Sequence, residues 1–461
     1  MASNHSVKIL EVCKVAPFSD SSEPFSELHL PLTFFDAFWF RFSPVERVFF
    51  YPLTDDSSDP TSFNSVILPK LKYTLSLTLR HFLPLAGNLT WPSHAAQPFL
   101  LFTPNDAVSL SVAESESNFD QLSGNKPRKA IESHPLVPKL SISDTTASIL
   151  ALQVTLFPDQ GFSIGLSTHH SILDGKSTTI FIKAWAFICK NGASPSLPAH
   201  LTPVFDRTVI QGPDGLLMKF LVQWANILRD PNPRNLKVMP QINSPENLIF
   251  STFELTREDI KKLRENVLSQ LSEEEEPKSI HLSTFVLVCA YTLSLIAKAK
   301  NFEQKKKVIF GFAADVRTRL EPPIPANYFG NCVASFHNTF TEAKDMVGKN
   351  GVVLIAKRIS GTIKGMDRGV IEETKGALEM FLNVEPGTPV VGVAGSPRFE
   401  VYGSDFGWGR PKKVETTSVH NTGAISLAES SDGSGGVEVG LALKEEEMEV
   451  FAASFADGLR H

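Results

Sequence analysis

The chain has 461 residues, of which 42% are apolar and 20% charged, and its formal net charge is −6. This length exceeds one ordinary hydrophobic core, so we expect two or three domains, with two large ones possible. The composition is that of a soluble globular protein, and the negative charge argues against a nucleic-acid binder.

The first 200 residues mix strand and helix patterns. Apolar residues recur at helical spacing in Ser65–Phe82, which predicts a helix. Two apolar runs, Ile149–Phe157 and Phe162–Thr168, flank a turn of Pro, Asp, Gln and Gly, and we expect paired strands there. The apolar segment Ser177–Lys190 then predicts a buried helix.

The middle of the chain changes character. Residues 201–244 are rich in Pro, Asn and Gly, and one short helix near Leu216–Leu228 interrupts them. A long segment with few strand signals is a linker or a functional crossover. We therefore predict an N-terminal domain in residues 1–200, a crossover linker in 201–244 and a C-terminal domain in 245–461.

The second half again alternates strands and helices. The patterns predict the strands Asn247–Glu254 and Lys307–Ala314, the helices Thr256–Leu271 and His281–Lys298, and a hairpin of Ala424–Glu429 with Val437–Leu443.

The cysteines and the N-terminus bear on the cellular compartment. The four cysteines (Cys13, Cys189, Cys289 and Cys332) are widely spaced, so we expect reduced thiols. We find no secretory signal pattern and no run approaching the roughly 18 apolar residues of a membrane span. A cytosolic protein is therefore expected.

The segment HHSILDG, residues 169–175, lies between a predicted strand and a predicted helix. Its His170 is a candidate general base, because the pKa of histidine lies near working pH. By strand alternation His169 points the other way, and we expect it to be structural. An HxxxD pattern occurs by chance about 0.5 times in such a chain, so alone it equally fits a capping aspartate beside a core histidine.

A second motif, DFGWG in residues 405–409, is expected by chance only on the order of 10⁻⁴ times. Together with HHSILDG it resembles the plant BAHD acyltransferases, and LTFFD (32–36), LPLAG (83–87) and ADVRTR (314–319) resemble further landmarks of that family. The resemblance implies an α/β fold of two similar domains like chloramphenicol acetyltransferase. Each would be a mixed sheet with flanking helices, with an active-site tunnel at their interface.

The segment YFGNC, residues 328–332, is similar to the signature of the anthocyanin and flavonoid malonyltransferase branch of that family. This resemblance implies malonyl-CoA as donor and the sugar hydroxyl of a phenolic or flavonoid glucoside as acceptor, with no permanently bound cofactor and no metal. Structurally the segment reads as a turn with a buried free cysteine, and we derive no chemical role for it from the sequence.

The resemblance also implies roles for single residues. His170 would take the proton from the acceptor hydroxyl, which attacks the thioester directly. Asp174 would form an ion pair with Arg317 or Arg319 and, with Gly175, hold the turn. Asp405 is either a second acid/base group or, as we favour, part of the loop that Gly407, Trp408 and Gly409 shape.

The sequence also offers candidates for contacts with the substrates. Lys176 is the first candidate for the malonyl carboxylate, and a solvated helix-start lysine is the alternative. The candidates for the coenzyme A phosphates, by resemblance, are Lys261, His281, Ser283 and Thr284.

Rival functions remain open at this point. A hydroxycinnamoyl-CoA transferase would keep the fold and change the donor, and a non-catalytic small-molecule carrier would keep the tunnel. A serine hydrolase is disfavoured because the GxSxG match at residues 161–165 lies at the start of a predicted strand and forms no nucleophile elbow. We expect a monomer.

Overall fold

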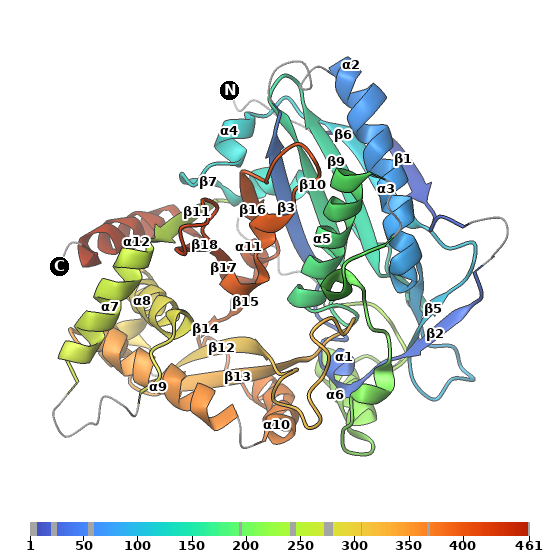
Figure 1. Cartoon of the computed structure of the whole chain (residues 1–461). Coiled ribbons are helices and arrows are strands. Elements are labelled where there is room, and N and C mark those ends of the chain that lie inside the picture. Colours follow the sequence, from blue (N-terminus) through green and yellow to red (C-terminus); the bar gives the residue numbers. More distant parts are fainter. Residues whose placement is uncertain are drawn as a thin grey trace.

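The computed structural model describes residues 7–19, 25–53, 60–192, 196–239, 246–271, 280–305, 307–366 and 369–459. Mixed and antiparallel sheets are packed with helices (Figure 1), which confirms the predicted α/β class.

A six-stranded sheet dominates the N-terminal half (Figure 1). Its strands β9 (Leu150–Phe157) and β10 (Gly161–Thr168) are buried along their whole length, so both of their faces are covered. The helices α3 (Leu68–His81) and α5 (Gly175–Asn191) lie on one face. In spatial order the strands are β1 (Lys8–Val15), β6 (Val108–Glu114), β9 (Leu150–Phe157), β10 (Gly161–Thr168), β3 (Val45–Pro52) and β16 (Lys413–Glu415).

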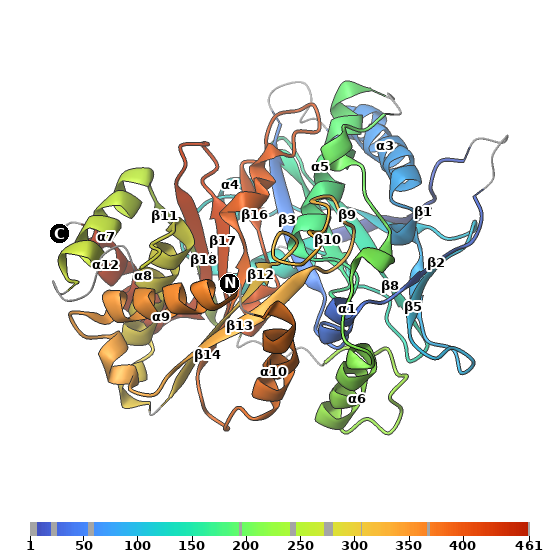
Figure 2. The same cartoon turned by 60° about the horizontal axis from the view of Figure 1, so that its bottom comes forward.

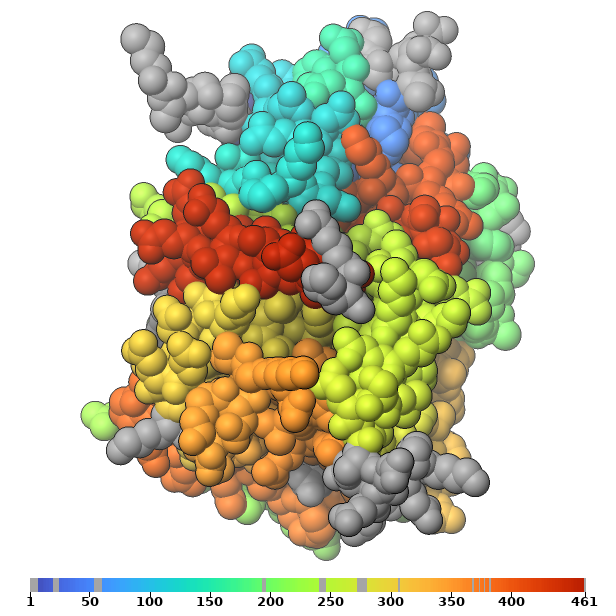
Figure 3. Space-filling view, turned by 90° about the vertical axis from the view of Figure 1, so that its left-hand side faces the viewer, coloured from blue at the N-terminus to red at the C-terminus, as the bar shows by residue number. Residues whose placement is uncertain are grey.

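The C-terminal half holds two further mixed sheets (Figure 2). One has the order β15 (Val393–Gly395), β17 (Ile425–Glu429), β18 (Val437–Lys444), β11 (Leu248–Leu255) and β7 (Arg128–Lys129), and the other β13 (Val333–Phe340), β12 (Val308–Asp315) and β14 (Val390–Val391). Helices of this half lie on the middle and lower part of the face seen in Figure 3, among them α7 (Arg257–Ser269), α8 (Thr284–Ala299), α9 (Gly351–Gly365) and α12 (Glu445–Gly458).

A small sheet and one further helix lie beside the larger sheets. A four-stranded antiparallel sheet consists of β2 (Leu28–Pro31), β5 (Phe99–Phe102), β4 (Asn88–Thr90) and β8 (Thr146–Ser148). Next to β13 lies the helix α10 (Val370–Leu382). Within the described ranges, no helix is both long and apolar enough to cross a membrane.

Two strands cross the division that the sequence suggested. The strand β7 belongs to the first 200 residues but pairs with β11, whereas β16 comes from the last fifty residues and pairs with β3. Between the halves, α6 (Leu216–Leu228) packs on α1 (Phe34–Phe38), where the Trp224 indole donates to the Phe38 carbonyl at 2.9 Å. Residues 240–244 of the expected linker lie outside the described residues. The domain limits therefore stay a prediction, and the exchanged strands tie the two halves together.

Candidate functional site

His170 lies in the turn between β10 and α5, so a buried strand and a long helix fix its backbone. Its imidazole stacks on the Trp39 ring, with centroids 4.2 Å apart and planes 2° apart, and Phe42 lies at 5.8 Å. Burial lowers the pKa of His170 to about 4. The ring is therefore neutral near pH 7 and able to accept a proton.

Both histidines of the motif are placed as the sequence suggested. His169 is fully buried, and its Nδ1 lies 3.0 Å from the Ser171 hydroxyl, which agrees with a structural role. By contrast His170 Nδ1 is buried and has no hydrogen-bond partner in the described part of the protein. Its surroundings are aromatic rather than charged, which explains why desolvation outweighs the other influences on its pKa.

Asp174 supports the turn with both carboxylate oxygens. Its Oδ1 caps α5 by accepting from the Ser177 N–H at 2.8 Å, and its Oδ2 lies 2.8 Å from Arg317 Nη2. Asp174 and Arg317 are both nearly inaccessible. Although burial opposes the charge on Arg317, the carboxylates of Asp174 and Asp315 raise its pKa above the ordinary value. The ion pair expected from the sequence is present and uses Arg317, whereas Arg319 is exposed.

The YFGNC segment also reaches this turn, which the sequence analysis missed. Asn331 Nδ2 donates to the backbone carbonyl of His170 at 3.0 Å and to Asp36 Oδ1 at 3.1 Å, and the Asn331 N–H donates to the same carboxylate oxygen at 3.2 Å. The Cys332 N–H donates to Asp174 Oδ2 at 3.2 Å. Asn331 and Asp36 are fully buried. Two motifs far apart in sequence thus hold the backbone of the HHSILDG turn.

A second buried arginine completes this support. Arg207 Nη1 donates to the Tyr328 hydroxyl at 2.8 Å and lies 3.5 Å from Asp36 Oδ2. Gly330 has a φ of 150°, and a Cβ there would lie 2.0 Å from Arg207 Nη1. Only glycine fits such a position. The carbonyls of Tyr328 and Gly330 also accept from Arg317 Nη2 at 3.1 and 3.2 Å.

The contacts of Asp405 favour its loop role over a catalytic one. Its carboxylate pairs with Lys190 Nζ at 2.6 Å and accepts from the N–H groups of Gly407 and Gly409 at 2.8 and 3.1 Å. Lys190 is at the far end of α5, roughly 22 Å along the helix axis from Gly175 at 1.5 Å per residue. Asp405 therefore lies remote from His170 and shapes its own loop.

The glycines and the aromatic residues of this loop pack it against the N-terminal half. Gly407 and Gly409 have φ angles of 105° and 97°, which side chains rarely allow. Phe406 packs edge-on against Trp185 of α5, and the Trp408 ring lies edge-on to Phe162 and under Lys70. Geometry thus favours the shape alternative for the whole motif.

The expected substrate contacts fall into two groups. Lys176, in the first turn of α5, pairs with Asp315 at 3.1 Å and is about one-third exposed. Ser283 is the N-cap of α8 and Thr284 its first residue, so both lie at a helix N-terminus of the kind that binds phosphate. Lys261 of α7 and His281 are exposed. Arg264, which the sequence analysis missed, joins α7 to this segment by donating to the Leu282 carbonyl at 2.6 Å.

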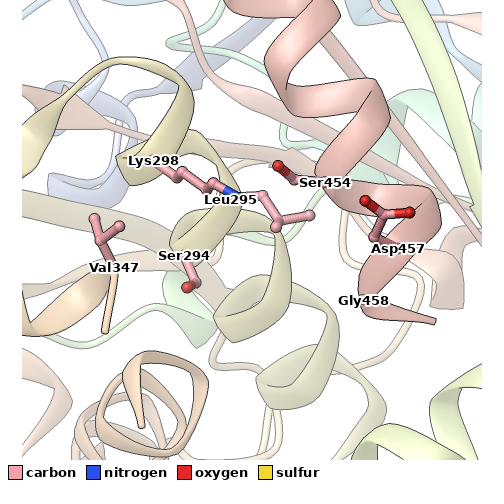
Figure 4. Close-up of a pocket in the computed structure, with 7 residues that line it drawn as sticks. All are labelled: Ser294, Leu295, Lys298, Val347, Ser454, Asp457 and Gly458. Carbon is pink, nitrogen blue, oxygen red and sulfur yellow. The ribbon is translucent and has the colours of Figure 1, made fainter. Parts of the chain in front are cut away.

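A surface pocket of about 320 Å³ lies elsewhere, next to α8 and α12 (Figure 4). Its lining consists of Ser294, Leu295, Lys298, Val347, Ser454, Asp457 and Gly458. None of these belongs to the motifs above, so the chemistry does not coincide with this hollow. Among the described residues, no cluster of three or more His, Cys, Asp or Glu could hold a metal ion.

Comparison with known sequences gives a consistent result. The model of the Transferase family matches residues 15–457. Phenolic glucoside malonyltransferase 1 of Arabidopsis thaliana is 45% identical, with 99% of this chain and 98% of that protein covered. A malonyl-CoA:anthocyanidin 5-O-glucoside-6''-O-malonyltransferase of the same plant is 43% identical over 99% of both chains. The agmatine coumaroyltransferase of Arabidopsis thaliana is 39% identical, with 97% of this chain and 98% of that protein covered.

Solved structures show the same fold at much lower identity. Vinorine synthase superposes with a TM-score of 0.70, covers 96% of both chains and is 20% identical. An F. graminearum TRI101 structure complexed with ethyl coenzyme A reaches a TM-score of 0.68 at 13% identity, covering 93% of this chain and 97% of that one. At these identities the likeness concerns the fold alone.

Proposed function

The chain belongs to the Transferase family of BAHD acyltransferases, and we propose that it moves a malonyl group from malonyl-CoA to a sugar hydroxyl of a phenolic or flavonoid glucoside. The observation that carries the reaction type is a neutral, desolvated His170 on a rigid turn. The relatives support the donor and acceptor, because two of those most similar to this chain are named as malonyltransferases of glucosides.

His170 is the general base in this proposal. It takes the proton of the acceptor hydroxyl as the oxygen attacks the thioester carbonyl, and the proton then passes to the leaving thiolate. Asp174, Arg317 and Asn331 hold the turn in place and do not touch the substrates. The phosphates of coenzyme A bind near Lys261, His281, Ser283 and Thr284. Lys176, which the sequence suggested for the malonyl carboxylate, is already paired with Asp315.

A hydroxycinnamoyl donor is the second candidate, because a relative at 39% identity is named as a coumaroyltransferase. One assay separates the two: steady-state rates with malonyl-CoA and with coumaroyl-CoA against a single phenolic glucoside. Higher kcat/KM with malonyl-CoA supports the proposal, and higher kcat/KM with coumaroyl-CoA overturns the donor while leaving the fold and base unchanged.

The His170→Ala variant tests the base. We expect kcat to fall by roughly 10²–10⁴-fold with coenzyme affinity near normal. More than about a tenth of wild-type activity in this variant would remove His170 from the mechanism, and turnover that depends on His170 would end the carrier alternative. We further propose a cytosolic monomer; four free cysteines agree with a reducing compartment.

A further inference from the structure

A buried cation that no motif explains lies on β3. Arg47 is only 4% exposed, and within the described chain its guanidinium makes one hydrogen bond, to Thr179 Oγ1 at 3.4 Å. None of the ion pairs between described residues involves it. A buried charge is costly unless a counter-charge contacts it. Arg47 therefore has no contacting counter-charge among the described residues.

The carboxylate of Glu429 compensates the charge of Arg47 only at a distance. Burial lowers the pKa of Arg47 to about 10, and Glu429 opposes this shift. Glu429 is itself partly buried and its pKa is raised by burial. One oxygen of its carboxylate accepts from the Tyr402 N–H at 2.8 Å, and the other has no partner in the described part of the chain.

Arg47 lines a small cavity beside the catalytic turn. Phe399, Val414, Thr416 and Ser426 are among the other residues around it, so it lies where β3, β16 and β17 approach each other. The cavity has a volume of about 10 Å³, room for about one water molecule. The Phe399 ring also packs against Gly175, where a Cβ would lie 2.6 Å from the ring. The cavity thus adjoins the first residue of α5.

Strand register places Arg47 on the strand next to the one that leads to His170. Arg47 pairs with Leu166, and Val45 pairs with Thr168, two residues before His170. At about 3.3 Å per residue, the Cα atoms of Arg47 and His170 are roughly 13 Å apart along the strand direction. For contact, the arginine side chain, the imidazole and the acyl group of the donor must together span this distance. The bond to Thr179 directs the guanidinium toward α5.

We infer that Arg47 binds the free carboxylate of the malonyl donor; this rests on the proposed function and names the residue that selects its donor. The guanidinium offers donors in a planar fork that matches both carboxylate oxygens, and a desolvated site strengthens such a contact. The Phe399 ring must move aside, because the cavity as it stands holds only a water. Lys176 is less suited, since Asp315 already neutralises it.

The test compares malonyl-CoA with acetyl-CoA in wild type, Arg47→Met, Arg47→Lys and Lys176→Ala. We expect Arg47→Met to reduce the malonyl-to-acetyl ratio of kcat/KM by roughly 10- to 100-fold, the worth of a charged hydrogen bond. Arg47→Lys keeps the charge but loses the fork, so its ratio should lie between wild type and Arg47→Met. The ratio in Lys176→Ala should stay near the wild-type value.

Each remaining outcome is decisive. A wild-type preference for malonyl-CoA that persists in Arg47→Met, or equal losses with both donors, would overturn the inference alone. A wild-type enzyme that does not discriminate the donors would overturn the proposed donor as well. If Arg47→Met proves too unstable to purify, Arg47→Lys makes the comparison, and a wild-type ratio in that variant contradicts fork-type recognition.

Discussion

The side-chain amide of Asn331 donates a hydrogen bond to the backbone carbonyl of His170 at 3.0 Å while Asp36 orients the same amide from its other side. Asn331 and Asp36 are both fully buried, so replacing this donor by a solvent molecule is costly. A segment that the sequence marked only as a family signature therefore fixes the position of the general base.

Replacing Asn331 by Ala should lower kcat by roughly 10- to 100-fold and change the KM of either substrate much less, because a small displacement of the base impairs attack more than binding. Steady-state kinetics beside a thermal melt measure this. The matched control is Cys332→Ala, since only the backbone N–H of Cys332 contacts Asp174. Equal losses of kcat in the two variants would contradict a positioning role for Asn331.

The pH dependence of activity should carry the signature of a desolvated base. Neutral His170 is the active form and its pKa lies near 4, so kcat/KM should stay level from about pH 8 to pH 5.5 and fall as pH drops through about 4. Stability should decline over a neighbouring range. The unfolded chain binds protons at His169 and His170 below about pH 6.5, whereas the folded chain does so only near their lowered pKa values. The folded state therefore loses stability as the pH falls below about 6.5.

Melting temperatures at each pH separate the two effects. An activity midpoint at pH 6 or above, at a pH where the melt is unchanged, would show that His170 titrates as an ordinary solvated histidine. The aromatic stack with Trp39 would then not exclude water from the ring.

Neutralising Asp174 should act mainly on stability. In Asp174→Asn the buried Arg317 loses its closest carboxylate and Asp315 remains, so we expect a loss of about 3 kcal/mol in the free energy of unfolding. Denaturant unfolding measures this. If the role is structural, the variant that remains folded should show the wild-type pH profile of kcat/KM. A profile whose midpoint moves by a full pH unit would instead make Asp174 a partner of His170 in proton transfer.

The parts of the fold and site that sequence predicts are those governed by local rules. The long helices α3, α5 and α8, the strands β9 to β12 and the hairpin β17–β18 all occur within a few residues of the expected limits, because apolar periodicity and turn residues define them. Short edge strands such as β7 and β16 carry too few residues to show a period, and their pairing depends on tertiary contacts.

Contacts of the site were predictable only where a motif or the family resemblance pointed to them. The ion pair of Asp174 with Arg317 was expected because the family resemblance suggested it, whereas the contact from Asn331 joins segments 161 residues apart and leaves no local signature. Asp36 was visible only as part of a landmark motif. The motif alone left both roles of Asp405 open, because the distance of Asp405 from His170 is set by the length of α5, which a motif cannot reveal.

The loop role of Asp405 has its own test. Asp405→Asn keeps an oxygen that can accept from the N–H groups of Gly407 and Gly409, whereas Asp405→Ala removes it. We therefore expect Asp405→Asn to keep kcat within about tenfold of wild type and Asp405→Ala to lose more, both with an unchanged pH profile. A loss in Asp405→Asn as large as that in His170→Ala would restore Asp405 as an acid/base group.

Within the described part of the chain, no activated nucleophile accompanies His170, and this favours direct transfer within a ternary complex. Burial raises the pKa of the Cys189, Cys289 and Cys332 thiols, so none of them is a ready thiolate. Direct attack requires the hydroxyl and the thioester carbon to approach to about 3–3.5 Å in one complex. We expect intersecting double-reciprocal lines when both substrates are varied. Parallel lines, or malonyl label that stays on the protein after gel filtration, would mean that an acyl-enzyme forms. Mass spectrometry of the labelled peptide would then identify the nucleophile, and the mechanism would change while the fold and family assignment stood.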